Sequence, residues 1–133
     1  MTTDLTVLEA KRYGIFGCQK NQSLYEAALK MVEEDISALV VVDPDGFLAG
    51  IISRTDLMRA LIESQDWQTK TVAEYMNVDV VTVSPQHTIG EVARLLLERQ
   101  IHRVVVVREL QGQLRPISVI SAADIVYHMT KGD

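Results

Sequence analysis

The chain has few of the cysteine residues that stabilise small proteins through disulfides or zinc sites. Its 133 residues include one cysteine, Cys18, which excludes an intramolecular disulfide and a zinc site made of cysteines. We interpret Cys18 as a small apolar strand residue, because free cysteine is usually buried. No metal site is predicted, since Asp43-Pro44-Asp45-Gly46 has the residues of a tight turn and lacks the spacing of a calcium loop.

Long apolar runs are also missing. The runs 38–42 and 104–107 are far shorter than the roughly 20 residues that a membrane helix needs, and residues 1–12 carry no signal-peptide stretch. We therefore expect no membrane partner and a cytoplasmic location. The formal net charge of -5, from 13 basic and 18 acidic residues, disfavours a nucleic-acid partner. The 47% hydrophobic content is that of an ordinary globular protein.

What is present is a repeat. An apolar run typical of a strand ends in Ser53-x-x-Asp56, and a second one ends in Ser121-x-x-Asp124, each at the start of a helical pattern. Ser-x-x-Asp at a helix start is typical of N-terminal capping. A hydroxyl and a carboxylate where a strand meets a helix can also hydrogen-bond a sugar diol, because α/β sheets bind ligands there. The sequence leaves both interpretations open, and the two are compatible.

Other elements repeat in the same order. Ser23-x-x-Glu26 and Thr88-x-x-Glu91 predict capping boxes 65 positions apart, each followed by an apolar helical stripe. The two Ser-x-x-Asp turns are 68 positions apart, and the extra residues fall in a predicted hairpin loop, 108–116. Further predictions are strands at 13–18, 37–42, 47–52 and 80–83, and helices at 54–63 and 71–76. In the connector 64–70, Trp67 is expected to pack over the junction of the halves more readily than to anchor a partner.

These patterns predict an α/β fold of two β-α-β-β-α repeats related by a pseudo-twofold axis. The boundaries are residues 1–68 for the first repeat and 69–133 for the second. Each repeat is too small to enclose a core alone, so we expect the two to pack sheet against sheet.

The repeat endings resemble a known family. Ala38-Leu39-Val40-Val41-Val42 with Gly50-Ile51-Ile52-Ser53, and His102-Arg103-Val104 with Val119-Ile120-Ser121, resemble the CBS-domain pair, or Bateman module, over about residues 7–129. The resemblance implies a regulatory module that binds AMP, ADP, ATP, S-adenosylmethionine or a related adenosyl ligand in clefts between the repeats. It also implies a homodimer formed through the helices and an unidentified regulated protein, and no cofactor is required.

The resemblance also implies roles for individual residues. The ribose would be contacted by Ser53, Asp56, Ser121 and Asp124. Ile101-His102-Arg103 resembles the His-Arg pair of the γ subunit of AMP-activated protein kinase, so His102 and Arg103 are candidate phosphate contacts, with Arg54 as a third. The adenine walls would be Ile52 and Ile120, with Gly17 and Thr82 on the first strands.

Alternatives stay open for several of these residues. Arg103 and Arg54 could simply face solvent, as surface arginines do. Ser37 and Ala38 stand where the second repeat has His102 and Arg103, so the two clefts are expected to differ in phosphate affinity.

Catalysis is not predicted. His87 and His128 lie far apart in the pattern, and the sequence has no glycine-rich phosphate loop and no nucleophile elbow. Two functions therefore remain, a nucleotide sensor and a ligand-independent dimerisation or interaction scaffold whose Ser-x-x-Asp turns are only caps. Leu57, Leu61, Ile125 and Met129 are available for a dimer face.

Overall fold

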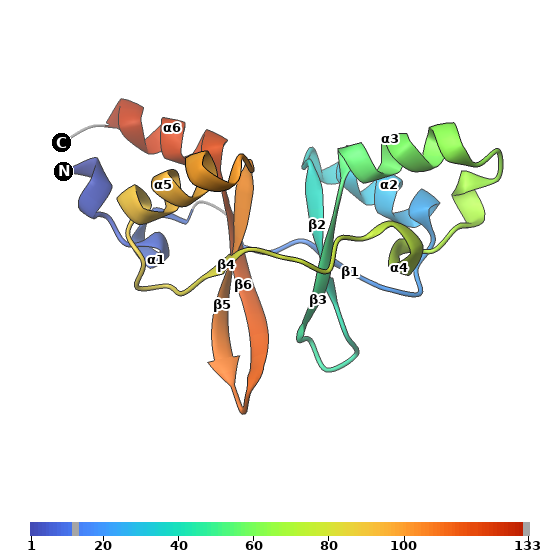
Figure 1. Ribbon diagram of the computed structural model, residues 1–133, viewed down its shortest axis with the longest axis horizontal. Coiled ribbons are helices and arrows are strands. Elements are labelled where there is room, and N and C mark those ends of the chain that lie inside the picture. Colours follow the sequence, from blue (N-terminus) through green and yellow to red (C-terminus); the bar gives the residue numbers. More distant parts are fainter. Residues whose placement is uncertain (12–13, 132–133) are drawn as a thin grey trace. The chain divides into compact units, whose positions relative to one another are not determined.

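The computed structural model describes residues 1–11 and 14–131, and the chain divides into two compact units (Figure 1). Unit 1 consists of Met1–Ile15 and Val81–Asp133, and unit 2 consists of Phe16–Val80. Each unit contains one three-stranded sheet with helices, which confirms the predicted α/β class. The repeat boundaries 1–68 and 69–133, and the packing of one sheet on the other, stay predictions.

Unit 2 is built on a sheet in the order β1-β2-β3. Its strands are β1 (Gly17–Gln19), β2 (Ala38–Val42) and β3 (Leu48–Ser53), and its helical elements are α2 (Leu24–Glu34), α3 (Arg54–Glu63), the 3-10 turn η2 (Trp67–Thr69) and α4 (Val72–Tyr75). β1 runs parallel to β2, and β2 runs antiparallel to β3. The core includes Leu24, Leu39 and Ile52, and Trp67 packs against it half-buried. Trp67 is therefore a packing residue of unit 2.

Unit 1 repeats this sheet as β4-β5-β6, with the same parallel and antiparallel pairings. Its strands are β4 (Thr82–Val83), β5 (Arg103–Leu110) and β6 (Gln113–Ser121), and its helical elements are the 3-10 turn η1 (Thr2–Asp4), α1 (Val7–Ala10), α5 (Ile89–Arg99) and α6 (Ala122–Lys131). The core is formed by apolar residues that include Val7, Ile89, Val104 and Ile120. None of the helices in the described ranges is long and apolar enough to cross a membrane.

Local sequence signals predicted several elements correctly. α3 begins at Arg54 and ends at Glu63, as expected from the periodicity. The turn at Asp43 is confirmed, because Asp43 Oδ1 accepts hydrogen bonds from the backbone N–H groups of Asp45 and Phe47, both at 2.9 Å. Gly46 follows with a φ of 88°, the left-handed conformation that glycine adopts most easily. These features depend on residues close in sequence, which is why they could be predicted.

The predicted hairpin at 108–116 is confirmed, and its strands extend almost to the tip. β5 continues to Leu110 and β6 begins at Gln113, so the extra residues of the second repeat lengthen a hairpin that Figure 1 shows extending well past the helices of its unit. Gln111 and Gly112 form the turn with φ values of 54° and 80°, and two successive left-handed residues suit a two-residue hairpin turn.

The short first strands also differ from prediction. β1 begins at Gly17 instead of residue 13, and β4 covers Thr82–Val83 instead of 80–83. Tyr13, where the first of these strands was expected to begin, lies outside the described residues. Each first strand has pairing contacts to only one neighbour in its sheet, so few ladder hydrogen bonds fix its length.

The two units exchange their leading segments. Thr6-Val7-Leu8-Glu9 and Thr71-Val72-Ala73-Glu74 lie 65 positions apart and start the short helices α1 and α4. The segment around α1 precedes the first repeat but belongs to unit 1, where Thr6 pairs with Thr88. The segment around α4 precedes the second repeat but belongs to unit 2, where Thr71 pairs with Ser23. Each unit is thus completed by the segment that leads into the other.

Candidate functional site

The first Ser-x-x-Asp turn joins β3 to α3. The carboxylate oxygen Asp56 Oδ2 accepts hydrogen bonds from the backbone N–H of Ser53 at 2.8 Å and from its hydroxyl at 3.0 Å. The Asp56 N–H donates back to Ser53 Oγ at 3.5 Å. This reciprocal capping box satisfies backbone donors that the helix start leaves free. The Asp56 side chain is 14% exposed, so part of the carboxylate remains accessible.

The second turn, between β6 and α6, has the same geometry. Asp124 Oδ2 accepts hydrogen bonds from the Ser121 N–H at 2.8 Å and from the Ser121 hydroxyl at 2.9 Å, and the Asp124 N–H donates to Ser121 Oγ at 3.3 Å. Asp124 is 7% exposed, which makes it one of the few buried polar residues described. The capping role of both turns is therefore confirmed, and the ligand role stays a prediction.

The choice of aspartate at these two turns is informative. Four other helices of the chain begin with the same box, and all four use glutamate as the returning acid: Thr6 with Glu9, Ser23 with Glu26, Thr71 with Glu74, and Thr88 with Glu91. Glutamate is the usual residue at this position of a capping box. Among the described residues, the shorter acid stands at the turns that follow β3 and β6.

The glutamates of these boxes are held in the charged form. Hydrogen bonds from the backbone N–H of the capping residue lower the pKa of Glu9, Glu74 and Glu91 below their ordinary value. The pKa of Glu26 is lowered first by the Gln22 side-chain amide and then by Ser23. All four are surface groups whose charge supports a helix start.

The candidate phosphate contacts lie beside the second turn. Arg103 is the first residue of β5, and its register partner on β6 is Ser121. His102 is exposed, and its backbone carbonyl accepts a hydrogen bond from the Ala122 N–H at 2.9 Å. In unit 2 the partner of Ser53 across the ladder is Ala38, so no cation arises from that strand position.

Arg54, the third candidate phosphate contact, begins α3. Its guanidinium is 57% exposed and lies 3.8 Å from the fully exposed carboxylate of Asp35. An exposed pair at this distance adds little to stability, because water screens both charges. Arg54 is therefore an exposed surface cation next to the first turn.

The candidate adenine walls divide into two kinds. Ile52 and Ile120 are 0% exposed and belong to the cores of unit 2 and unit 1, so their side chains present no surface to a ligand. The alternation of a strand turns their neighbours Ile51 and Val119, both half-buried, toward the opposite face of each sheet. The apolar runs in the sequence do not indicate which face of each sheet forms the core.

The other two wall candidates lie on the first strands. Gly17 of β1 and Thr82 of β4 occupy corresponding places, opposite Val40 and Val105. The Gly17 carbonyl accepts a hydrogen bond from the Lys30 ammonium at 2.7 Å. A Cβ at Gly17 would stand 3.2 Å from the Val40 carbonyl oxygen, so the site favours glycine on packing grounds.

One neighbour of the first turn was missed by sequence reasoning. Arg59 Nη2 donates to Asp56 Oδ1 at 3.1 Å and approaches the Tyr75 carbonyl at 3.4 Å. Its guanidinium also lies 5.7 Å from the centre of the Tyr75 ring. The three-residue spacing from Asp56 to Arg59 on a helix was the signal that could have revealed the pair.

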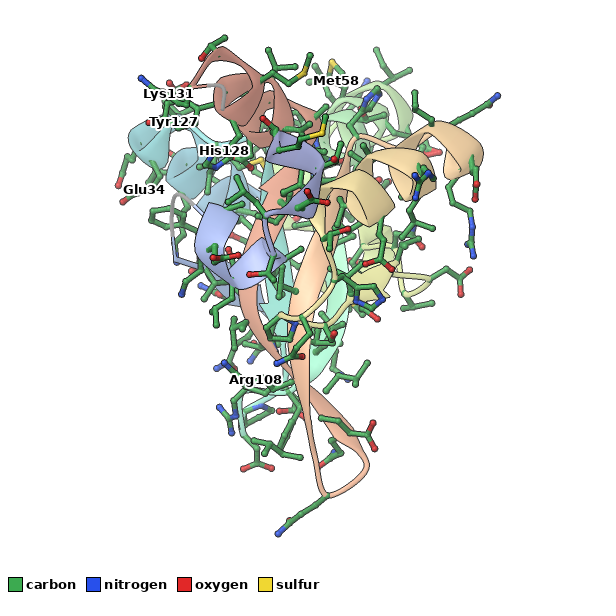
Figure 2. All side chains as sticks on the ribbon, turned by 90° about the vertical axis from the view of Figure 1, so that its left-hand side faces the viewer. Glu34, Met58, Arg108, Tyr127, His128 and Lys131 are labelled. Carbon is green, nitrogen blue, oxygen red and sulfur yellow. The ribbon has the colours of Figure 1, made fainter. Side chains whose placement is uncertain are left out.

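The histidines outside the candidate site have structural partners. His87 Nδ1 accepts a hydrogen bond from the Ser84 N–H at 2.9 Å, next to the start of α5. His128 Nε2 lies 2.6 Å from the Ala10 carbonyl, and its ring packs edge-on to Tyr127 (Figure 2). Within residues 1–11 and 14–131, no cluster of three or more histidine, cysteine, aspartate or glutamate side chains could hold a metal ion.

Comparison with known proteins gives consistent matches. The family model described as "CBS domain" matches residues 1–63 and 72–131. The transcriptional repressor CcpN of Bacillus subtilis is 33% identical over 92 residues, which cover 68% of this chain and 43% of the repressor. Hypoxic response protein 1 of Mycobacterium tuberculosis is 28% identical over 130 residues, 97% of this chain and 86% of that protein. This chain therefore spans less than half of the repressor and most of the second relative.

Solved structures match equally well. The CBS domain pair of protein MJ0100, solved in complex with 5′-methylthioadenosine and S-adenosyl-L-methionine, superposes with a TM-score of 0.84 at 26% identity. The match covers 96% of this chain and 98% of that one. The architecture thus has a counterpart of nearly the same length.

Proposed function

Because the chain belongs to the CBS-domain family and forms a tandem pair of such domains, we propose that it is a regulatory module that binds an adenosine-containing ligand. Candidate ligands are AMP, ADP, ATP and S-adenosylmethionine. The ligand acts as a signal, and the module reports its binding to a regulated protein without catalysing a reaction. A cytoplasmic location and the identity of that protein stay predictions.

The observation that carries this proposal is the use of aspartate at both strand-to-helix turns. Glutamate closes the other four capping boxes, so capping alone does not explain Asp56 and Asp124. In each turn Oδ2 accepts hydrogen bonds from the serine. The two oxygens of a carboxylate have about four acceptor positions, so a ribose hydroxyl can be added to the contacts within the protein. A ribose diol supplies two adjacent hydroxyl donors, and a short side chain holds the carboxylate close to the backbone where such a ring could lie.

The related structures support the ligand class. The MJ0100 pair, at 26% identity, was solved with two adenosyl compounds. In our proposal Ser53 and Asp56, and Ser121 and Asp124, contact the ribose. Arg103 contacts a phosphate group together with His102, because forked guanidinium donors suit phosphate oxygens. Arg54 adds an exposed positive charge beside the first turn.

The adenine contacts need a different assignment from the one based on sequence. Ile52 and Ile120 are enclosed in the cores. We assign the apolar contact to their neighbours Ile51 and Val119, which share a strand face with the serines, together with the strand backbone at Gly17 and Thr82.

The test lengthens the acidic side chain at each turn from aspartate to glutamate. Asp56→Glu and Asp124→Glu keep the charge and the residue type that caps four other helices, but they move each carboxylate by one methylene. We expect thermal unfolding to change little and ligand binding to be lost at the altered turn. Glu26→Asp and Glu91→Asp are matched controls, because they shorten the acid of a capping box away from the proposed site.

The readout is a thermal-unfolding scan against AMP, ADP, ATP, S-adenosylmethionine, NAD and cyclic dinucleotides. A ligand at 100 times its Kd stabilises the folded state by about 2.7 kcal/mol, which gives a clear shift in Tm. A shift that disappears in an Asp→Glu variant and persists in both controls supports the sensor. No shift with any compound would favour the alternative, a dimerisation or interaction scaffold in which the turns only cap helices.

Homodimerisation through the helices is a second part of the proposal. Leu61 of α3 and Met129 of α6 correspond in the repeat and are 56% and 63% exposed, while Leu57 and Ile125 beside them are half-buried. Exposed apolar residues at the same position of two helices suit contact with a second copy. Light scattering should give twice the chain mass, and Leu61→Glu combined with Met129→Glu should give the monomer.

A further inference from the structure

The carboxylate of the first turn is held from two sides within unit 2. Ser53 occupies Asp56 Oδ2, and Arg59 Nη2 donates to the other oxygen, Oδ1, at 3.1 Å. The guanidinium is in turn placed by Tyr75, through the carbonyl at 3.4 Å and the ring at 5.7 Å. Asp56 is therefore connected through Arg59 to the last residue of α4.

The segment after α4 returns to the same strand. Asn77 and Ile51 exchange two backbone hydrogen bonds, at 2.9 and 2.8 Å, and Ile51 precedes Ser53 by two residues on β3. The contacts thus form a closed circuit from β3 through the turn and Arg59 to α4 and back to β3. Within this circuit the Arg59 side chain is the direct link between Asp56 and Tyr75.

The second turn is built differently at this position. Tyr127 of α6 stands where α3 has Arg59, 68 positions earlier. The Tyr127 ring packs edge-on to His128 with centroids 5.1 Å apart, and Lys131 lies 5.1 Å above it (Figure 2). At this helix position α3 therefore supplies a guanidinium and α6 supplies a phenol ring.

We propose that Arg59 is a positioning residue for ligand binding at the first turn, one that fixes Asp56 Oδ1 toward a ribose hydroxyl and links ligand occupancy to residues 75–77. This inference rests on the proposed function. Each carboxylate oxygen has about two acceptor sites. Arg59 uses one site of Oδ1 and leaves the other for a ligand hydroxyl in a fixed direction. Without Arg59 the carboxylate keeps its charge and loses that direction.

Removal of the side chain is compatible with folding. Arg59 is 48% exposed and lines an open hollow of about 470 Å³ with Glu63, Lys70, Glu74 and Tyr75. Glu74 is occupied by its own capping box with Thr71, at 2.7 Å to the backbone N–H. Truncation of Arg59 would widen a surface hollow that is already open to water, so no buried cavity forms.

The ligand test compares AMP with 2′-deoxy-AMP by isothermal titration calorimetry, in an Asp124→Glu background that isolates the first turn. For Arg59→Ala we expect AMP to bind about tenfold more weakly and 2′-deoxy-AMP to bind almost unchanged, because the lost contact is one charge-directed hydrogen bond to a ribose hydroxyl. Arg59→Lys should restore part of the preference for AMP. The control is Arg94→Ala, an exposed arginine of α5. If Arg59→Ala binds AMP and 2′-deoxy-AMP each with the same affinity as the parent protein does, the inference is overturned.

A second measurement needs no ligand. Hydrogen exchange at the amides of Met76 and Asn77 should become faster in Arg59→Ala and stay unchanged in Arg94→Ala, because α4 loses its tie to α3. Unchanged exchange would overturn the link to residues 75–77. If the parent protein binds no adenine nucleotide while exchange responds to Arg59, the proposed function fails together with the ligand role of Arg59, and the structural tie stands.

Discussion

Unit 1 and unit 2 have the same backbone plan and different side chains around their turns. The C-caps of helices α2 and α5 are corresponding residues, Asp35 and Gln100, which have φ values of 52° and 54°. In both hairpins the strand register shifts at corresponding places, between Val41 and Val42 in unit 2 and between Val106 and Val107 in unit 1. The duplication thus retains the features that set backbone geometry.

The differences gather where a ligand would bind. Ala38 faces Ser53 across the ladder in unit 2, and Arg103 faces Ser121 in unit 1. Arg59 holds Asp56, and its counterpart is Tyr127. Two sites of one architecture can therefore have different ligand preferences, since architecture sets the turn and its neighbours set the chemistry.

The largest effect is expected where unit 2 requires glycine and unit 1 does not. A Cβ at Gly50 would lie 2.8 Å from the Asn77 carbonyl oxygen and 3.0 Å from Met76 Sδ, whereas unit 1 has the buried Ser118 at this place. Gly50→Ser should destabilise the protein by about 2 to 3 kcal/mol in urea unfolding, as overpacking against backbone does. Gly14→Ser is the control, because a Cβ there meets nothing within 4 Å. Equal stability of the two variants would show that residues 76–77 move aside freely.

The next largest effect is expected on the affinity for the phosphate group of AMP. Arg103→Ala should weaken AMP binding at the second turn about tenfold, or about 1.4 kcal/mol, and leave adenosine binding unchanged, because only AMP has a partner for the guanidinium. Ala38→Arg is the reciprocal change and should raise AMP affinity at the first turn. Calorimetry with both ligands measures the two effects. Arg108→Ala, on the exposed half of the hairpin (Figure 2), is the control, and equal losses for AMP and adenosine would contradict a phosphate role.

The smallest effect is expected at Cys18, whose counterpart in unit 1 is Val83. Both side chains are buried, at 6% and 4% exposed, and burial raises the pKa of the Cys18 thiol to about 11. Cys18→Val should change the free energy of unfolding by less than about 1.5 kcal/mol, as near-isosteric core changes do. In the unaltered protein a thiol reagent at neutral pH should modify Cys18 only as fast as unit 2 opens. Rapid modification of the folded protein would show that Cys18 is not a core residue.

Sequence reasoning succeeded where the cause is local. The boxes at Ser23 and Thr88 and the extent of α3 depend on residues within one helical turn, and all are confirmed. The hairpin at 108–116 is confirmed too, but the sequence did not predict how far its strands extend, because pairing across the hairpin decides where β5 ends. The burial of Ile52 and Ile120 was also missed, since an apolar run does not reveal which face of a sheet meets the core.

Two further features of the candidate site needed the structure. The hydrogen bond from Arg59 to the Tyr75 carbonyl joins residues 16 positions apart, and no local sequence pattern predicts it. The repeated Thr6-Val7 and Thr71-Val72 segments were visible in the sequence, but repetition alone does not show which unit each segment completes.

Because the leading segments are exchanged, the two units become able to fold at different times during synthesis. Unit 2 is one continuous stretch, Phe16–Val80, so it can fold as soon as Val80 has left the ribosome. Unit 1 cannot fold until the stretch from Val81 onward has been synthesised, although Met1–Ile15 is made first. When these two segments then pair, they close a chain loop that contains all of unit 2. Loop closure costs entropy that grows only slowly with length, and a folded insert shortens the flexible part of the loop. The order of translation therefore favours the folding of unit 2 first and of unit 1 afterwards.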